Sequence, residues 1–161
     1  MAGELFAALE TTALARALRD SVWAYPLVNA GHILGVALLV GAIVPLDLKL
    51  LGFWPAWPLG PLWHVLTRAA GAGLVLAATC GVLLFIARAG EYAASDLFLC
   101  KMVAVACGIA NAAALRGFAP ADFSSARHGT DRSVGRIRVA AAISMLAWLT
   151  ALTLGRLVGY F

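Results

Sequence analysis

Charged residues are scarce in this chain, and their scarcity excludes most soluble architectures. Only 12% of the 161 residues are Asp, Glu, Lys or Arg, whereas an average soluble domain has roughly 25%. No polar stretch is longer than about 25 residues, and a separate water-soluble domain needs about 50. Because 63% of the residues are hydrophobic and the mean hydropathy is +0.91, we expect a single integral membrane domain.

Several functional motifs are also missing from the sequence. There is no carboxylate pair for acid–base catalysis, no Ser, His and Asp combination, and no glycine-rich phosphate loop with its lysine. An enzyme is therefore not expected. The net charge of +4 is spread over helix ends without a basic face interleaved with aromatics, so nucleic acid is not expected as a partner.

Cysteines are few and do not suggest a disulfide framework. The three cysteines, Cys80, Cys100 and Cys107, include no Cys-x-x-Cys pair and all fall in or beside apolar runs. Their default role is that of small buried apolar residues. Cys100 and Cys107 would share a helix face, an arrangement that could also hold a soft metal ion.

Four long apolar runs make up most of the chain. Each has about 20 residues, the length with which a helix crosses a bilayer, and none carries the charged stripe of a soluble helix. We therefore predict an all-α protein, an integral membrane four-helix bundle formed by residues 21–161. Its spans are expected at about residues 22–46, 62–87, 97–115 and 139–160.

Residues 1–20 differ from the rest because they mix charged side chains with leucines and Phe6. A cleavable signal peptide begins with a basic segment followed directly by an apolar run, and here the first apolar run starts only after Asp20. We predict that residues 1–20 form a short amphipathic interfacial helix, with its apolar side chains facing the membrane.

The positions of Lys and Arg predict the orientation. Four spans place both termini on one face, and seven of the twelve basic residues lie on the other, five of them in the polar stretch 116–138. We expect this stretch to be a loop broken by Pro120 and Gly129, in the cytoplasm, with both termini outside. It would serve as a solvated connector or as a docking surface for a soluble partner. The Trp- and Pro-rich stretch from Pro45 to Pro61 is expected to lie at headgroup level as a broken segment.

His32 is the main functional candidate. It falls about ten residues into the first span, where an ionisable side chain is a functional-site hypothesis by default. A neutral imidazole can bind a b-type haem or a copper ion. The alternative is a structural hydrogen bond to a neighbouring helix, for example to Asn29 or Asn111. His64 is expected roughly 10 to 15 Å away in depth, so the two histidines should not clamp one haem.

Other polar residues in the spans are expected to have structural roles. Asp47 and Arg68 are predicted to form an ion pair that joins the first two helices. Asn111 should make an interhelical hydrogen bond. Lys101, one turn into the third span, is expected to reach out to Asp96, Glu91 or Asp20 near the outer face.

Some of these residues also carry a resemblance. The segment SVWAYPLVNAGHILGVALLVG, residues 21–41, is followed by DLKLLG, CGVLLF, Lys101 and Asn111. Together they resemble an uncharacterised family of small bacterial four-helix inner-membrane proteins, which implies a bacterial inner membrane. With the orientation expected from Lys and Arg, both termini would then be periplasmic. A looser similarity is to the CopD-type copper-resistance membrane proteins, which have a His near the middle of an early helix. Relatives are expected to have a further His shortly after the position of Asn111, where this chain has only AAALRG.

Three functions remain open at this point. We favour a non-catalytic membrane protein, a small subunit or scaffold whose partner is another membrane protein or a second copy. The alternative is a redox or metal protein that binds b-type haem or copper through His32. The third is a small transporter, which usually shows repeats or broken helices, and here only Pro26 and Pro45 hint at that.

Overall fold

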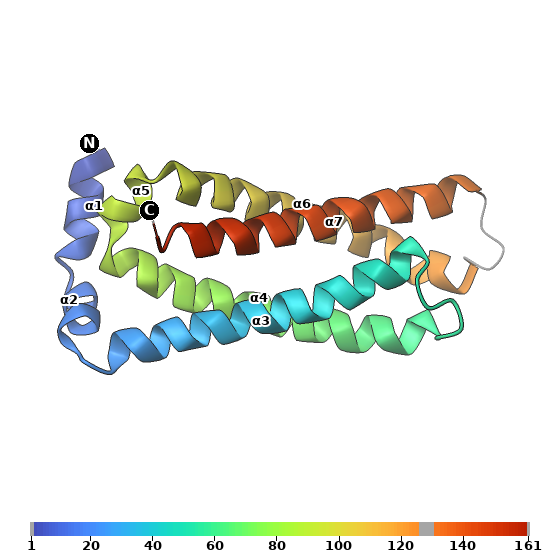
Figure 1. The fold of residues 1–161 in the computed structure, drawn as a ribbon, viewed down its shortest axis with the longest axis horizontal. Helices are drawn as coiled ribbons and strands as arrows, with labels where there is room; N and C mark the ends of the chain where they lie inside the picture. Colours follow the sequence, from blue (N-terminus) through green and yellow to red (C-terminus); the bar gives the residue numbers. More distant parts are fainter. Residues whose placement is uncertain (1, 126–130, 161) are drawn as a thin grey trace.

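The computed structural model describes residues 2–125 and 131–160, and the side chains of residues 3–116 and 134–160. These parts of the chain form helices and no strand (Figure 1). The helices are α1 (Ala2–Glu10), α2 (Ala13–Asp20), α3 (Ala24–Leu51), α4 (Leu59–Ala87), α5 (Ala89–Ala94), α6 (Asp96–Ser125) and α7 (Asp131–Leu157).

Four of these helices are long and apolar enough to cross a membrane. The candidate spans are Ala24–Leu51, Leu59–Ala87, Asp96–Arg116 and Val134–Leu157. The predicted all-α four-helix arrangement is confirmed, and the chain is a multi-pass integral membrane protein. Both termini lie at one end of the bundle together with α1, α2 and α5 (Figure 1).

Two prolines expected to interrupt helices lie inside helices instead. Helix α3 continues through Pro45 to Leu51, and α6 continues through Pro120 to Ser125, while Gly129, the other expected break, lies outside the described residues. A proline inside a helix removes one backbone N–H, and membrane helices tolerate this because neighbouring groups satisfy the freed carbonyl. Helix α3 ends instead at Gly52, whose φ of 109° lies in the left-handed region and whose N–H bonds back to Leu48 and Lys49.

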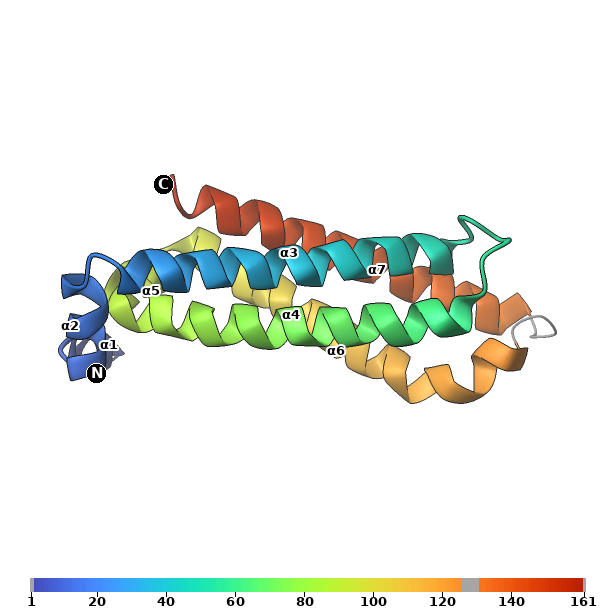
Figure 2. The ribbon, with the colours of Figure 1, turned by 90° about the horizontal axis from the view of Figure 1, so that it is seen from below.

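The long helices form two hairpins. Helix α3 packs against α4, and α6 packs against α7, while the hairpins meet through contacts between α3 and α7 (Figures 1 and 2). We call this α3–α7 contact the seam. Its apolar core consists of two clusters of buried side chains: Leu39, Ile43 and Trp148 in one, and Leu46, Leu50 and Ala141 in the other.

The α3–α4 hairpin depends on glycines at the point of closest approach. A Cβ added to Gly35 would lie 2.4 Å from the backbone nitrogen of Ala77, and one added to Gly73 would lie 2.5 Å from that of Leu39. Only hydrogen fits in that space. Lipid tails give no hydrophobic drive between helices, so close backbone approach of this kind supplies much of the packing energy.

The N-terminal segment caps the end of the bundle that carries both termini. It is not one helix, as predicted, but two, since the chain breaks at Thr12, whose hydroxyl accepts a hydrogen bond from Ala15 at 3.2 Å. Arg19 fixes this cap by donating to the carbonyls of Ala87, at 2.8 Å, and Glu10, at 2.7 Å. The Glu10 carboxylate in turn accepts from the N–H of Gly90 at 2.8 Å.

Candidate functional site: polar side chains within the spans

The His32 side chain points inward, as predicted, and meets α4. Its Nδ1 lies 2.8 Å from the carbonyl oxygen of Ala77. A carbonyl only accepts, so Nδ1 carries the proton and donates, and Nε2 keeps its lone pair. The ring lies over Gly81, where an added Cβ would be 3.1 Å from Cε1. The structure thus gives His32 a backbone partner, and not the Asn29 or Asn111 side chains.

His64 does not share a site with His32. The level of His32 along α4 is marked by Ala77, so thirteen residues of helix separate it from His64, or roughly 20 Å at 1.5 Å per residue. Within the described part of the chain, no group of three or more His, Cys, Asp and Glu residues could hold a metal ion. In the described part of the chain, His32 therefore does not belong to a cluster of metal-ligating side chains.

Asp47 is the most deeply buried charged-type residue in the described structure. It is 3% exposed, and its carboxyl receives a hydrogen bond from the hydroxyl of Ser144 on α7, itself 7% exposed. The second carboxyl oxygen, Oδ2, is buried without a partner. A polar atom in this condition costs free energy in an apolar surrounding, so its presence calls for an explanation.

The predicted ion pair between Asp47 and Arg68 is wrong. Asp47 faces α7 across the seam, whereas Arg68 is exposed on α4, and no ion pair joins them among the described side chains. Asp47 and Arg68 were expected to pair because they lie at similar depth in the membrane. Their side chains leave the two helices in different directions, so they do not meet.

The remaining polar candidates are placed separately. Asn111 makes the predicted interhelical hydrogen bond, from Nδ2 to the carbonyl of Ala140 on α7 at 3.0 Å. Lys101 does not reach an acidic side chain in the described structure. It lies along α7 instead, with its Nζ 3.4 Å from where a Cβ of Gly155 would be. Asn29 is exposed.

Two polar residues of the seam, Ser144 and Trp148, were not predicted from the sequence. Ser144 was not singled out because hydroxyls are common in apolar helices, and only the fold places it beside Asp47. Trp148, 3% exposed, was also missed, and its indole Nε1 is buried without a partner. The signal for its position was Gly108, where an added Cβ would lie 2.8 Å from the indole.

An aromatic cluster lies where the N-terminal cap meets the bundle. Phe85 stacks on Phe98 with ring centroids 5.6 Å apart, and Phe6 of α1 meets Phe85 edge-on at 6.2 Å. Tyr92 of α5 lies 5.3 Å from Phe98 and interacts with Tyr25. Burial in this cluster raises the pKa of the Tyr92 phenol, and its hydrogen bond with Tyr25 adds to the shift.

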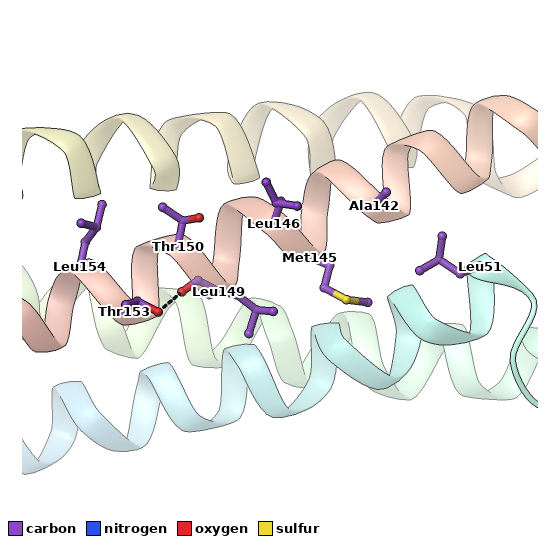
Figure 3. A pocket seen from close by; sticks show the side chains of 8 residues that line it. All are labelled: Leu51, Ala142, Met145, Leu146, Leu149, Thr150, Thr153 and Leu154. Carbon is purple, nitrogen blue, oxygen red and sulfur yellow. Dashed lines mark hydrogen bonds between the residues drawn. The ribbon is translucent and has the colours of Figure 1, made fainter.

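A groove on the surface follows α7 on its outer side. It has a volume of about 460 Å³ and is open to the surroundings. Figure 3 shows its lining side chains, which come from α7 and from the end of α3: Leu51, Ala142, Met145, Leu146, Leu149, Thr150, Thr153 and Leu154. The Thr153 hydroxyl donates to the Leu149 carbonyl at 2.9 Å, so the groove is essentially apolar and suits lipid chains or another helix.

No family model matches this chain, and neither a curated protein nor a solved structure is similar to it. The resemblance drawn from the sequence to bacterial inner-membrane proteins thus stays a prediction.

Proposed function

We propose that this protein is a small non-catalytic subunit or scaffold of a membrane assembly, in a bacterial inner membrane with both termini in the periplasm. The observation that carries the proposal is the exposed face of α6. Among the spans as the structure describes them, α6 packs closely only against α7. In the described part of α6, Gly108 is the one residue that is buried.

The outward side of α6 carries a row of small side chains in its second half: Ala106, Cys107, Ala110, Ala113 and Ala114. Larger exposed side chains, Leu99, Met102, Val103 and Ile109, lie beside and before them. Small side chains allow two membrane helices to approach closely, and they are enriched where such helices meet. The exposed face of α4 alternates valines (Val65, Val75 and Val82) with small residues, so the row of small side chains from Ala106 to Ala114 distinguishes α6. We therefore assign the α6 face to a partner helix.

The polar residues within the spans support the same function. His32 and Asn111 both bond to backbone carbonyls of a neighbouring helix. Each such bond fixes the rotation of one helix against another, because the donor must meet one particular carbonyl. These side chains hold the bundle in shape, as a scaffold requires.

The alternative is a b-type haem or copper ion bound through His32. One observation favours it: donation from Nδ1 to a carbonyl is the usual way in which proteins orient a histidine whose other nitrogen binds a metal. The described chain gathers no group of three metal-ligating side chains around His32, so a complete three-ligand site would need a ligand from a partner protein.

Cross-linking in membranes tests the proposed interface. Single cysteines would be placed at Ala110 and, as the matched control, at Val75 on α4, both in a variant without the native cysteines. With a short bifunctional maleimide we expect a product of defined mass from the position 110 variant and none from the position 75 variant. Products from both positions, or from neither, would contradict an interface on α6. The mass of the product distinguishes a second copy from another protein.

A further inference from the structure

Asp47 lies in the middle of the seam that holds the two hairpins together. The cluster of Leu39, Ile43 and Trp148 precedes it along α3. The second cluster includes Leu46 and Leu50, which flank Asp47 in the sequence. Because α3 packs on α7 here, a change at Asp47 acts on the contact between the hairpins. The structural roles proposed for His32 and Asn111 do not involve this residue.

An ionised Asp47 would have no counter-charge. The basic groups near this end of the surrounding helices are Lys49 on α3, His64 and Arg68 on α4, Arg116 on α6, and Arg136 and Arg138 on α7. Within the described residues none of them forms an ion pair with Asp47, and the Ser144 hydroxyl is the single side-chain partner that acts on it.

Three of these basic groups are directed elsewhere, and His64, Arg68 and Arg136 are exposed. Lys49 donates to the carbonyl of Trp54 in the loop after α3. Arg138 approaches the end of α3, with a guanidinium nitrogen 3.5 Å from where a Cβ of Gly52 would be. Arg116 is exposed, and its guanidinium lies beside Gly71 of α4. An unpaired carboxylate within the hydrocarbon region is strongly disfavoured, so another way of neutralising Asp47 is needed.

We propose that Asp47 and Ser144 form a proton-binding site inside the membrane. Asp47 takes up one proton from water and becomes a neutral carboxylic acid. The Ser144 hydroxyl donates to one carboxyl oxygen, and the unpartnered Oδ2 is the oxygen that carries the proton. Release of this proton to water leaves a charge in the seam and weakens the contact between α3 and α7.

The position of the site is suited to exchange with water. Asp47 lies four residues before the end of α3 at Leu51, which is roughly 6 Å along the helix axis. Pro45, two residues earlier, removes the hydrogen bond that would otherwise tie the Gly41 carbonyl to the following turn. This part of α3 therefore has one restraint fewer against a small displacement from α7.

Infrared difference spectroscopy tests the site directly. The purified protein would be measured in phosphatidylcholine nanodiscs at about pH 5.5, where an exposed aspartate is ionised. Subtracting the spectrum of Asp47→Asn should isolate one carbonyl stretch of a protonated carboxylic acid, which moves to lower frequency in D2O. The matched control is Asp96→Asn, which removes an exposed carboxyl at the start of α6 and should leave that band unchanged.

Two further results decide the role of each residue. Ser144→Ala should keep the band but move it to higher frequency, because the carbonyl loses a hydrogen bond. Raising the pH should remove the band and lower resistance to detergent unfolding in the wild type, while Asp47→Asn stays resistant. A difference spectrum that contains only carboxylate bands at pH 5.5 would overturn the proposal, as would a band that Ser144→Ala leaves in place without a shift.

Discussion

Replacing Gly35 by alanine is the most informative change to the fold, because it adds a single carbon atom. Its Cβ would lie 2.4 Å from the Ala77 nitrogen and 2.9 Å from the Gly73 carbonyl oxygen. Both are backbone atoms of α4 and cannot rotate away. Ordinary contact begins at 3.4 Å, so α3 and α4 must separate by about 1 Å at this level.

The energetic cost follows from this separation. A gap of 0.5 to 1 Å already loses roughly a quarter to a half of the dispersion energy of the atoms across it, and overpacking a tight contact typically costs about 1–3 kcal/mol. The His32–Ala77 hydrogen bond, 2.8 Å long, would be stretched beyond useful length. Bonds of this kind contribute about 0.6 kcal/mol on average in membrane proteins. We therefore expect Gly35→Ala to lower the free energy of unfolding by about 2–4 kcal/mol.

Gly41→Ala is the matched control. Gly41 lies in the same helix, and an added Cβ there would meet nothing within 4 Å, so alanine should be neutral or stabilising by up to ~1 kcal/mol. Both variants would be unfolded reversibly with SDS from mixed micelles and followed by circular dichroism. If Gly35→Ala is as stable as Gly41→Ala to within about 0.5 kcal/mol, the proposed role of the α3–α4 contact is wrong. Combining Gly35→Ala with Gly73→Ala should cost less than the sum of the single changes, because the first has already separated the helices.

Two other predictions concern the candidate ligand and the orientation. His32→Ala should lower stability by about 0.6–1.7 kcal/mol, measured by the same SDS titration, while His32→Gln should keep part of the bond to α4. In the same samples, a Soret band or bound copper that His32→Ala removes and His64→Ala keeps would favour the haem or copper alternative over the scaffold. A cysteine replacing Ser125, in a cysteine-free background, should be protected from an impermeant maleimide added outside intact cells. Labelling from outside would reverse the proposed orientation.

The membrane architecture could be predicted from the sequence because a bilayer imposes a simple requirement. A helix must remain apolar for about 20 residues to cross it, and four stretches of this chain meet that condition. Helix ends depend on local competition instead. Pro45 does not stop α3. The helix continues to Leu51 and ends at Gly52, which adopts a left-handed conformation.

The polar contacts were only partly predictable, because depth can be read from sequence but direction cannot. His32 was correctly expected to face inward, and Asn111 to bond across helices. The Asp47–Arg68 pair failed because a residue in a span can face any of several neighbours. Ser144 could be recognised as the partner of Asp47 only once α3 and α7 were placed side by side.

The glycines of the spans mark the places where large side chains of a neighbouring helix pack. Three large inward-pointing side chains each lie over a glycine of the neighbouring helix: His32 over Gly81, Trp148 over Gly108 and Lys101 over Gly155. A glycine exposes its backbone, so a ring or a long side chain can lie directly on the facing helix. In the case of His32 the exposed backbone also supplies the acceptor, the carbonyl of Ala77 one turn before Gly81.

In a membrane helix, then, the partner of a buried polar side chain should be sought first among backbone carbonyls near small residues. An ionised acidic side chain only accepts hydrogen bonds and gains nothing from a carbonyl. An aspartate such as Asp47 therefore needs a donor such as the Ser144 hydroxyl, whereas His32 needs only a backbone carbonyl that a neighbouring glycine leaves accessible.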